Sequence, residues 1–173
     1  MKLVYKVCSK EDIPQLVAIA TQSYQEHYTH LWTDGGKNYM KNSFNEEQFL
    51  KEIVQPNSIF FLVIIDNLPV GLVKLNIDKA VDDYSANEAL ELERIYFLKN
   101  ASGKGLGKET LLMITAFAKD RNKKIIWLKA MKGGNAEAFY QKQGFDVIGE
   151  TLLDYPFIRA EHTEMVIMSK KTA

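Results

Sequence analysis

The pattern of apolar and polar positions along the chain predicts a mixed α/β fold. Unbroken apolar runs bounded by turn residues are typical of buried strands, whereas apolar residues three or four positions apart are typical of helices. Strands followed by strand–helix alternation indicate one domain over residues 1–173, with a mixed sheet that has helices on both faces. The strands are expected at 3–8, 58–65, 70–77, 90–98, 124–131, 147–153 and 164–169, and the helices at 13–24, 45–53, 106–121 and 136–143.

Polar residues between these elements mark their ends. Ser9-Lys-Glu-Asp12 has the form of a capping box before the first helix, and Asp66-Asn-Leu-Pro69 is a hairpin signal. Gly35-Gly36 interrupts a polar and aromatic segment, and the acidic stretch 78–88 is expected to be a loop.

The most informative segment is a glycine-rich turn between the strand at 90–98 and the helix that begins near Leu106. Gly103, Gly105 and Gly107 alternate there, which gathers backbone N–H groups at the positive end of a helix and favours an anion such as a pyrophosphate. The spacing fits neither a P-loop, because Glu109 follows Gly107-Lys108, nor a Gly-x-Gly-x-x-Gly dinucleotide fingerprint. Alternatively, the loop only starts a helix and binds nothing.

A second motif lies after the strand at 124–131. The run Asn135-Ala-Glu-Ala-Phe-Tyr-Gln-Lys-Gln-Gly-Phe145 follows Gly133-Gly134, begins with a good N-cap and reaches a glycine stop after two turns. The glycine loop and this run together closely resemble the GNAT superfamily of acyl-CoA-dependent N-acyltransferases, from about residue 59 to 145. Leu90-Glu-Leu-Glu-Arg-Ile-Tyr and Lys123-Lys-Ile-Ile-Trp-Leu further resemble bacterial PaiA-type polyamine (spermidine/spermine) acetyltransferases.

The resemblance implies a mostly antiparallel sheet of about six to seven strands and a site for acetyl-CoA. The pyrophosphate would lie on the loop backbone, and the pantetheine arm would pair with the central strand like an added strand. Asn135 would bond the pantetheine or only cap its helix, and Lys142 would meet a phosphate or only solvent. Ser102 stands where the family commonly has Gln or Arg, so one side-chain contact is expected to be missing. The implied cofactor residues are Ile95, Tyr96, Phe97, Gly103, Lys104, Gly105, Leu106, Gly107, Lys108, Asn135 and Lys142.

Acyl transfer to an amine needs a base, because deprotonating an alkyl ammonium at pH 7 costs about 4–5 kcal/mol. Glu91 and Glu93 share one face of the central strand by its period of two. By resemblance, Glu93 matches the general base and Glu91 is kept as a substrate-binding carboxylate; alternatively, Glu93 is a surface charge that is solvated or paired with Arg94. Tyr140 matches the general acid that protonates the leaving thiolate, or it is a core aromatic beside Phe139.

The acceptor is indicated less directly. Aromatic residues such as Tyr28 and Trp32, together with Glu91, suit a cationic amine, although aromatics at helical spacing are more often core. The leading hypothesis is acetyl transfer to a primary amine of a small molecule, a polyamine in particular. The alternatives are a protein or peptide N-acetyltransferase and a non-catalytic acyl-CoA sensor.

Composition excludes several other classes. The 22 basic and 22 acidic residues cancel, so no attraction to nucleic acid or to a membrane surface is expected. There is no apolar run of ~20 residues and no secretory signal, and the single cysteine, Cys8, forms no disulfide framework, so a cytoplasmic protein is expected. The three histidines lack metal-ligand spacing, so no metal is expected. A homodimer is compatible with the fold, but no residue pattern indicates one.

Overall fold

The computed structural model describes all 173 residues, which form two compact units. Unit 1 comprises Met1–Leu75, Arg94–Lys104 and Tyr155–Phe157, and unit 2 comprises Asn76–Glu93, Gly105–Asp154 and Ile158–Ala173. Seven strands form one sheet in the order β1-β2-β3-β4-β5-β7-β6. Strands β4 and β5 are parallel, whereas the β1–β2, β5–β7 and β6–β7 pairs are antiparallel. The predicted mixed, mostly antiparallel α/β sheet is therefore confirmed.

Unit 1 contains the N-terminal strands and three α-helices. Its strands are β1 (Leu3–Val7), β2 (Ser58–Ile65), most of β3 (Leu68–Asn76) and the end of β4 (Ala89–Phe97), and its helices are α1 (Ile13–His27), α2 (Lys37–Ser43) and α3 (Glu46–Ile53). Asp66 and Asn67, between β2 and β3, both have positive φ, which is the conformation of a type I′ turn and confirms the predicted hairpin. Its short 3-10 helices are Lys10–Asp12, Thr29–Leu31 and Lys99–Ala101.

Local side-chain contacts start the helices of unit 1. Before α1, the Asp12 carboxylate accepts the backbone N–H of Ser9 at 2.9 Å, and Asn45 caps α3 by accepting the N–H of Gln48 at 2.8 Å. Helix α2 is not predicted by the apolar pattern. It begins because the Asp34 carboxylate accepts the N–H groups of Gly36 and Asn38, each at 2.9 Å, a local turn that carries no apolar repeat.

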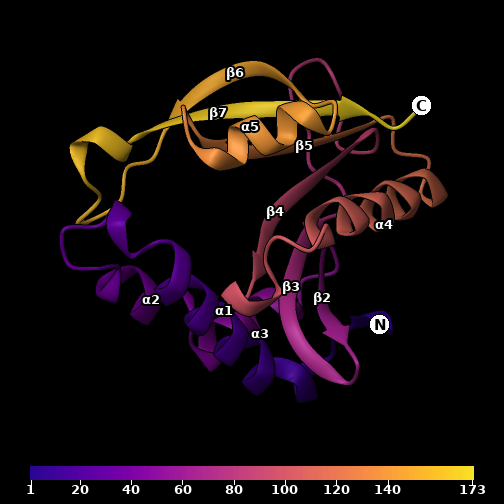
Figure 1. Cartoon of the computed structure of the whole chain (residues 1–173). Helices are drawn as coiled ribbons and strands as arrows, with labels where there is room; N and C mark the ends of the chain where they lie inside the picture. The colour runs from indigo at the N-terminus through magenta and orange to yellow at the C-terminus, as the bar shows by residue number, and fades with distance from the viewer. The chain divides into compact units, whose positions relative to one another are not determined.

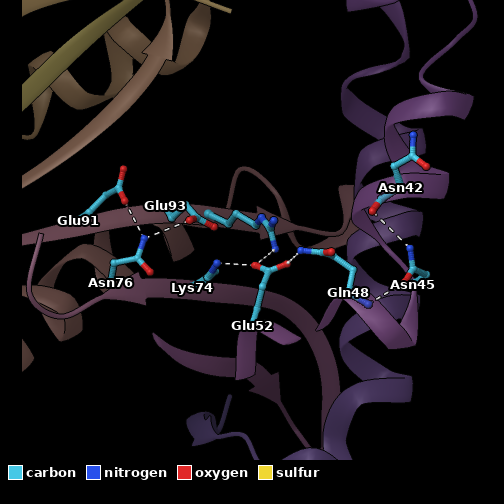
Figure 2. Close-up of polar contacts among 9 residues, drawn as sticks. Asn42, Asn45, Gln48, Glu52, Lys74, Asn76, Glu91 and Glu93 are labelled. Carbon is cyan, nitrogen blue, oxygen red and sulfur yellow. Dashed lines mark hydrogen bonds and ion pairs between the residues drawn. The ribbon is translucent and has the colours of Figure 1, made fainter. Parts of the chain in front are cut away.

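Unit 1 also buries a small cluster of charges, shown in Figure 2. One oxygen of Glu52 on α3 accepts a hydrogen bond from Lys74 on β3 and forms an ion pair with Arg94 on β4 at 3.1 Å; the other accepts from Gln48 at 3.2 Å. The side chains of Glu52, Lys74 and Arg94 are only 11%, 7% and 13% exposed. The Arg94 guanidinium also lies over the ring of Phe49, with 5.7 Å to the centroid. A carboxylate and aromatic faces therefore compensate the two buried cations.

Close packing against the end of β4 requires a glycine on β3. A Cβ at Gly71 would lie 2.6 Å from both the ring of Phe97 and the carbonyl oxygen of Tyr96. Because one of these atoms is backbone, a side-chain rotation alone would not make room for it. Gly71 therefore fixes how closely β3 approaches Phe97.

Unit 2 contains the C-terminal strands and two helices. Its elements are the start of β4, α4 (Leu106–Asp120), β5 (Ile125–Met131), α5 (Asn135–Lys142), β6 (Asp146–Leu152) and β7 (Glu164–Lys171), with a 3-10 turn at Ala160–His162. Helix α5 runs beside β5 (Figure 1). Ala89, Ile125 and Trp127 form a buried cluster, against which Val81 and Tyr84 of the predicted 78–88 loop pack.

Ion pairs hold both ends of that loop. The buried Lys123 ammonium donates to Asp78 and to the carbonyls of Ala86 and Asn87, and Lys124 pairs with Glu88 at 2.6 Å. The hydrogen bond from Lys124 lowers the pKa of Glu88 to about 2. None of the helices combines the length and the apolar character that crossing a membrane would require.

Candidate functional site

Two carboxylates lie together on β4 in unit 2, where the period of two places them on one face. The side-chain nitrogen of Asn76, the last residue of β3, donates to Glu91 at 2.7 Å and to Glu93 at 3.1 Å. Figure 2 shows the Asn76 amide between the two carboxylates. The oxygens that share this nitrogen are within about 6 Å of each other, because each is within hydrogen-bond distance of it.

The two carboxylates differ in their surroundings. Glu91 is only 8% exposed, whereas Glu93 is exposed. Asn76 is the hydrogen-bond partner of the Glu91 side chain, and no Lys, Arg or His forms an ion pair with it. A buried carboxylate is ordinarily compensated by a cation, and Glu91 differs from that pattern because its side chain contacts an amide.

Both carboxylates lie where β4 separates from β5. The parallel pairing joins Ala89–Glu91 to Ile125–Trp127 and is not continued at Leu92 and Glu93, although these also belong to unit 2. Strand β5 instead continues its pairing with β7 as far as Met131. Beyond Glu91, the residues of β4 in this unit therefore have no partner on β5.

The start of α4 has the form that an anion site needs. Gly105, its N-cap, has φ of +75°, and Gly103 has φ of +77°, a conformation that favours glycine. The N–H of Glu109 makes the first helical hydrogen bond, to the carbonyl of Gly105 at 3.2 Å. The N–H groups of Leu106, Gly107 and Lys108 precede it and point out of the helix end. The Leu106 side chain is buried and anchors this turn.

Gly107 has a second role, in packing. A Cβ there would lie 3.0 Å from Cζ of Phe139 on α5. The absence of a side chain therefore brings the first turn of α4 against α5, which carries the other predicted cofactor and acid residues. Sequence analysis assigned this glycine only to ligand contact, because its neighbour is 32 residues away along the chain and the contact has no local signal.

Helix α5 begins one residue earlier than predicted. Gly134 is its N-cap, and Asn135 is its first helical residue, so the prediction that Asn135 is the N-cap is wrong. The Glu137 carboxylate reaches back to accept the N–H of Gly133 at 3.3 Å, so this acid serves the helix start instead. Asn135 and Lys142 are both exposed.

Tyr140 is largely buried, with 7% of its surface exposed. Its ring is 5.2 Å from that of Phe139 and 5.5 Å from that of Phe145, measured between centroids. The core packing considered for this residue is therefore present.

In unit 1, the end of β4 carries Ile95, Tyr96 and Phe97, all half-buried. The carbonyl of Phe97 is 3.1 Å from Nε2 of His27, so one backbone group predicted for pantetheine already has a side-chain neighbour. Ser102, the departure from the family pattern, donates its hydroxyl to the carbonyl of Leu98 at 3.2 Å. Its side chain therefore folds back on its own loop, next to the exposed Gly103 and Lys104.

The predicted substrate residues Tyr28 and Trp32 belong to an aromatic cluster of unit 1. Trp32 is 2% exposed, stacks on Tyr39 at 4.8 Å and donates its indole N–H to the Tyr24 hydroxyl at 2.9 Å. Tyr28 is half-buried, 4.9 Å from the ring of Tyr24. Burial raises the pKa of the Tyr24, Tyr28 and Tyr39 hydroxyls, so all three stay neutral. Trp32 supports this cluster from within, and Tyr28 is the more accessible of the two predicted residues.

Asn76 is the polar residue that sequence analysis missed. Its one signal is a polar side chain inside the apolar run at 70–77. The partners of Asn76 depend on where β3 and β4 stand relative to the long loop between them, which the sequence does not specify.

Two surface cavities of unit 2, of about 430 and 550 Å³, both lie beside Tyr84. Neither is lined by a residue predicted for the site, and neither is assigned to acyl transfer.

Known proteins share this architecture. Residues 18–145 match the sequence profile described as the Acetyltransferase (GNAT) family. An uncharacterised N-acetyltransferase in the pepI 3′ region of Lactobacillus delbrueckii subsp. lactis is 28% identical over 145 residues, which cover 82% of this chain and 83% of that protein.

Solved structures agree in fold at lower identity. The PaiA N-acetyltransferase of Thermoplasma acidophilum, in complex with coenzyme A, is 21% identical with a TM-score of 0.74, covering 99% of both chains. A mutant of the spermidine N-acetyltransferase SpeG of Vibrio cholerae is 16% identical with a TM-score of 0.70, covering 98% of this chain and 94% of that one. The profile match spans more than half of the chain and includes both the glycine-rich turn and α5, so this protein belongs to the GNAT family and is an acetyl-CoA-dependent N-acetyltransferase.

Proposed function

We propose that the acetyl acceptor is a small cationic amine, in particular a polyamine. The observation that carries this proposal is Glu91, a buried carboxylate beside a second carboxylate, with an amide and no cation as its partner. A polyamine brings at least two ammonium groups. One would pair with Glu91 while another nitrogen, once neutral, would be acetylated near Glu93.

The chemistry assigned to Glu93 and Tyr140 is direct transfer. Glu93 takes a proton from the acceptor nitrogen, whose lone pair then attacks the thioester carbonyl carbon. The C–S bond breaks as the C–N bond forms, and Tyr140 protonates the departing thiolate of CoA. The exposed position of Glu93 on a strand edge without a β5 partner supports access to an amine.

The proposed acetyl-CoA contacts divide between backbone and side chains. The N–H groups at the start of α4, from Gly105 to Lys108, suit the pyrophosphate, with Gly103 and Lys104 before them. The backbone of β4 from Ile95 to Phe97 suits the pantetheine. Asn135 and Lys142 at the exposed face of α5 suit the pantetheine arm and a phosphate, and Tyr28 and Trp32 would line or support the acceptor side.

The test compares amines that differ in charge. Thiol release from acetyl-CoA is measured with spermidine, putrescine and n-butylamine, for the wild type and for Glu91→Gln. The substitution should raise KM for spermidine at least about tenfold, equal to about 1.4 kcal/mol, and change KM for butylamine little. Glu150→Gln, an exposed carboxylate on β6, is the matched control.

Two results would overturn the proposal. An equal rise in KM for spermidine and for butylamine in Glu91→Gln would show that Glu91 does not bind a second ammonium group of the acceptor. Turnover of peptide amines alone, with every small amine inert, would assign the enzyme to protein or peptide acetylation. For the catalytic roles, Glu93→Gln and Tyr140→Phe should each lower kcat at least about tenfold.

A further inference from the structure

We infer that Asn76 is a positioning residue, which holds Glu91 and Glu93 as one pair and so fixes the proton-accepting carboxylate relative to the carboxylate that holds the acceptor. The inference rests on the function proposed above, because Asn76 acts only through these two residues. It adds a residue on β3 to the two carboxylates on β4.

The geometry of the amide is the first argument. A carboxamide nitrogen carries two hydrogens, and the Asn76 nitrogen is within hydrogen-bond distance of one oxygen from each glutamate, at 2.7 and 3.1 Å. The nitrogen therefore has one hydrogen available for each carboxylate, and the amide is oriented with its nitrogen toward both (Figure 2). A movement of either glutamate would break a hydrogen bond that the same nitrogen makes.

The second argument concerns like charges. Two carboxylates on one strand face repel, and long glutamate side chains hold many rotamers when nothing fixes them. A shared neutral donor counters both effects without supplying a positive charge. A lysine or arginine in the place of Asn76 would neutralise Glu91 and compete with a cationic acceptor. An asparagine orders the pair and leaves the negative charge of Glu91 for the substrate.

Loss of the donor should therefore affect chemistry more than cofactor binding. In Asn76→Ala, kcat with spermidine should fall about tenfold to a hundredfold, the range expected when a reacting group is misplaced by about 1 Å. The dissociation constant of acetyl-CoA, measured by calorimetry, should stay within about twofold. Asn76→Asp, which keeps the size but replaces the donor by a third carboxylate, should be at least as impaired. Asn42→Ala, an exposed asparagine on α2, is the control.

Double-mutant cycles distinguish a positioning role of Asn76 from a merely structural one. If Asn76 acts through Glu93, then Asn76→Ala should change kcat less than about threefold in a Glu93→Gln background. If Asn76 also acts through Glu91, the effect of Asn76→Ala on KM for spermidine should likewise be smaller in a Glu91→Gln background. This second cycle can be measured even if Glu93→Gln is nearly inactive. Far-UV circular dichroism and acetyl-CoA binding check that each variant is folded.

The possible outcomes distinguish this inference from the proposed function. Suppose first that Glu93→Gln lowers kcat. If Asn76→Ala is then harmless, or if its effect multiplies in full with that of the glutamate substitution in both cycles, Asn76 is not a positioning residue and the proposed function still stands. If Glu93→Gln leaves kcat unchanged, the proposed base is wrong and the inference falls with it. Non-additivity in both cycles supports the inference.

Discussion

The buried charges of unit 1 allow a sharp prediction about stability. In Glu52→Gln, the side chain keeps its size but loses its charge, while Lys74 and Arg94 remain in place. In the wild type, the carboxylate pairs with both cations and accepts a hydrogen bond from Gln48. A neutral amide has one oxygen to accept with and turns two donors toward groups that are themselves donors.

The expected cost follows from burial. All three charged side chains are at most 13% exposed. In other proteins, removing one partner from a buried ion pair typically lowers the free energy of unfolding by about 3–5 kcal/mol. Since Lys74 and Arg94 also have aromatic neighbours, we take the lower end, about 3 kcal/mol. For a chain of this length, this corresponds to a drop in Tm of roughly 6–12 °C.

Urea unfolding is the appropriate assay, because guanidinium salts would screen the charges. Far-UV circular dichroism and tryptophan fluorescence should be followed together, since agreement of their midpoints justifies a two-state free energy. Glu47→Gln is the matched control: it lies on the same helix, is 83% exposed and pairs with Lys51 at 3.4 Å, so its effect should stay below about 1 kcal/mol. Equal midpoints for the two variants would refute the argument from burial.

Four further outcomes are expected. Gly71→Ala should destabilise the protein by about 2 kcal/mol in urea unfolding, whereas Gly149→Ala, whose Cβ would meet nothing closer than 3.7 Å, should cost far less; similar losses would contradict the packing argument. The pKa of Glu88 is about 2 in the folded protein and about 4.3 in the unfolded chain. The ion pair of Glu88 with Lys124 therefore stabilises the fold above about pH 4.3, and this contribution is lost as the pH falls from about 4.3 toward 2. The gap in urea midpoint between wild type and Glu88→Gln should therefore narrow over this interval, and a constant gap would exclude the ion pair as its cause. Burial raises the pKa of Cys8 to about 12, so iodoacetamide at pH 8 should alkylate the native protein at least about tenfold more slowly than the unfolded chain, by mass spectrometry; equal rates would refute this. Glu91→Met should raise the urea midpoint while abolishing the preference for spermidine over butylamine, and a lower midpoint would show that Glu91 stabilises the fold.

The sequence predicts the backbone of this protein well, because the backbone follows local rules. Strand and helix ends agree to within one or two residues for β2, β4, β5 and α4, where apolar runs and turn residues coincide. The same rules failed at α2, which depends on one Asp34 turn, and moved the N-cap of α5 from Gly134 to Asn135, since both residues are good caps.

The candidate site likewise contains features that follow local rules and features that depend on contacts between distant segments. Glycines and alternation indicate an anion-binding turn and a pair of acids on one face without any knowledge of tertiary structure. The link between those acids needs the position of Asn76, and the packing role of Gly107 needs Phe139. Both contacts join segments separated by long stretches of chain, and no period or spacing in the sequence encodes such a separation.

The charged residues of β4 differ in how the protein compensates them. Arg94 follows Glu93 directly, so alternation turns its side chain to the opposite face, where a carboxylate and aromatic rings receive it. Glu91 is at least as buried, yet only an amide contacts it. A residue selected for stability alone would be apolar at such a position, because an uncompensated buried charge is costly. Arg94 is compensated within the protein, whereas Glu91 contacts only an amide, and this asymmetry between the two faces of one strand is the reason we propose a cationic acceptor.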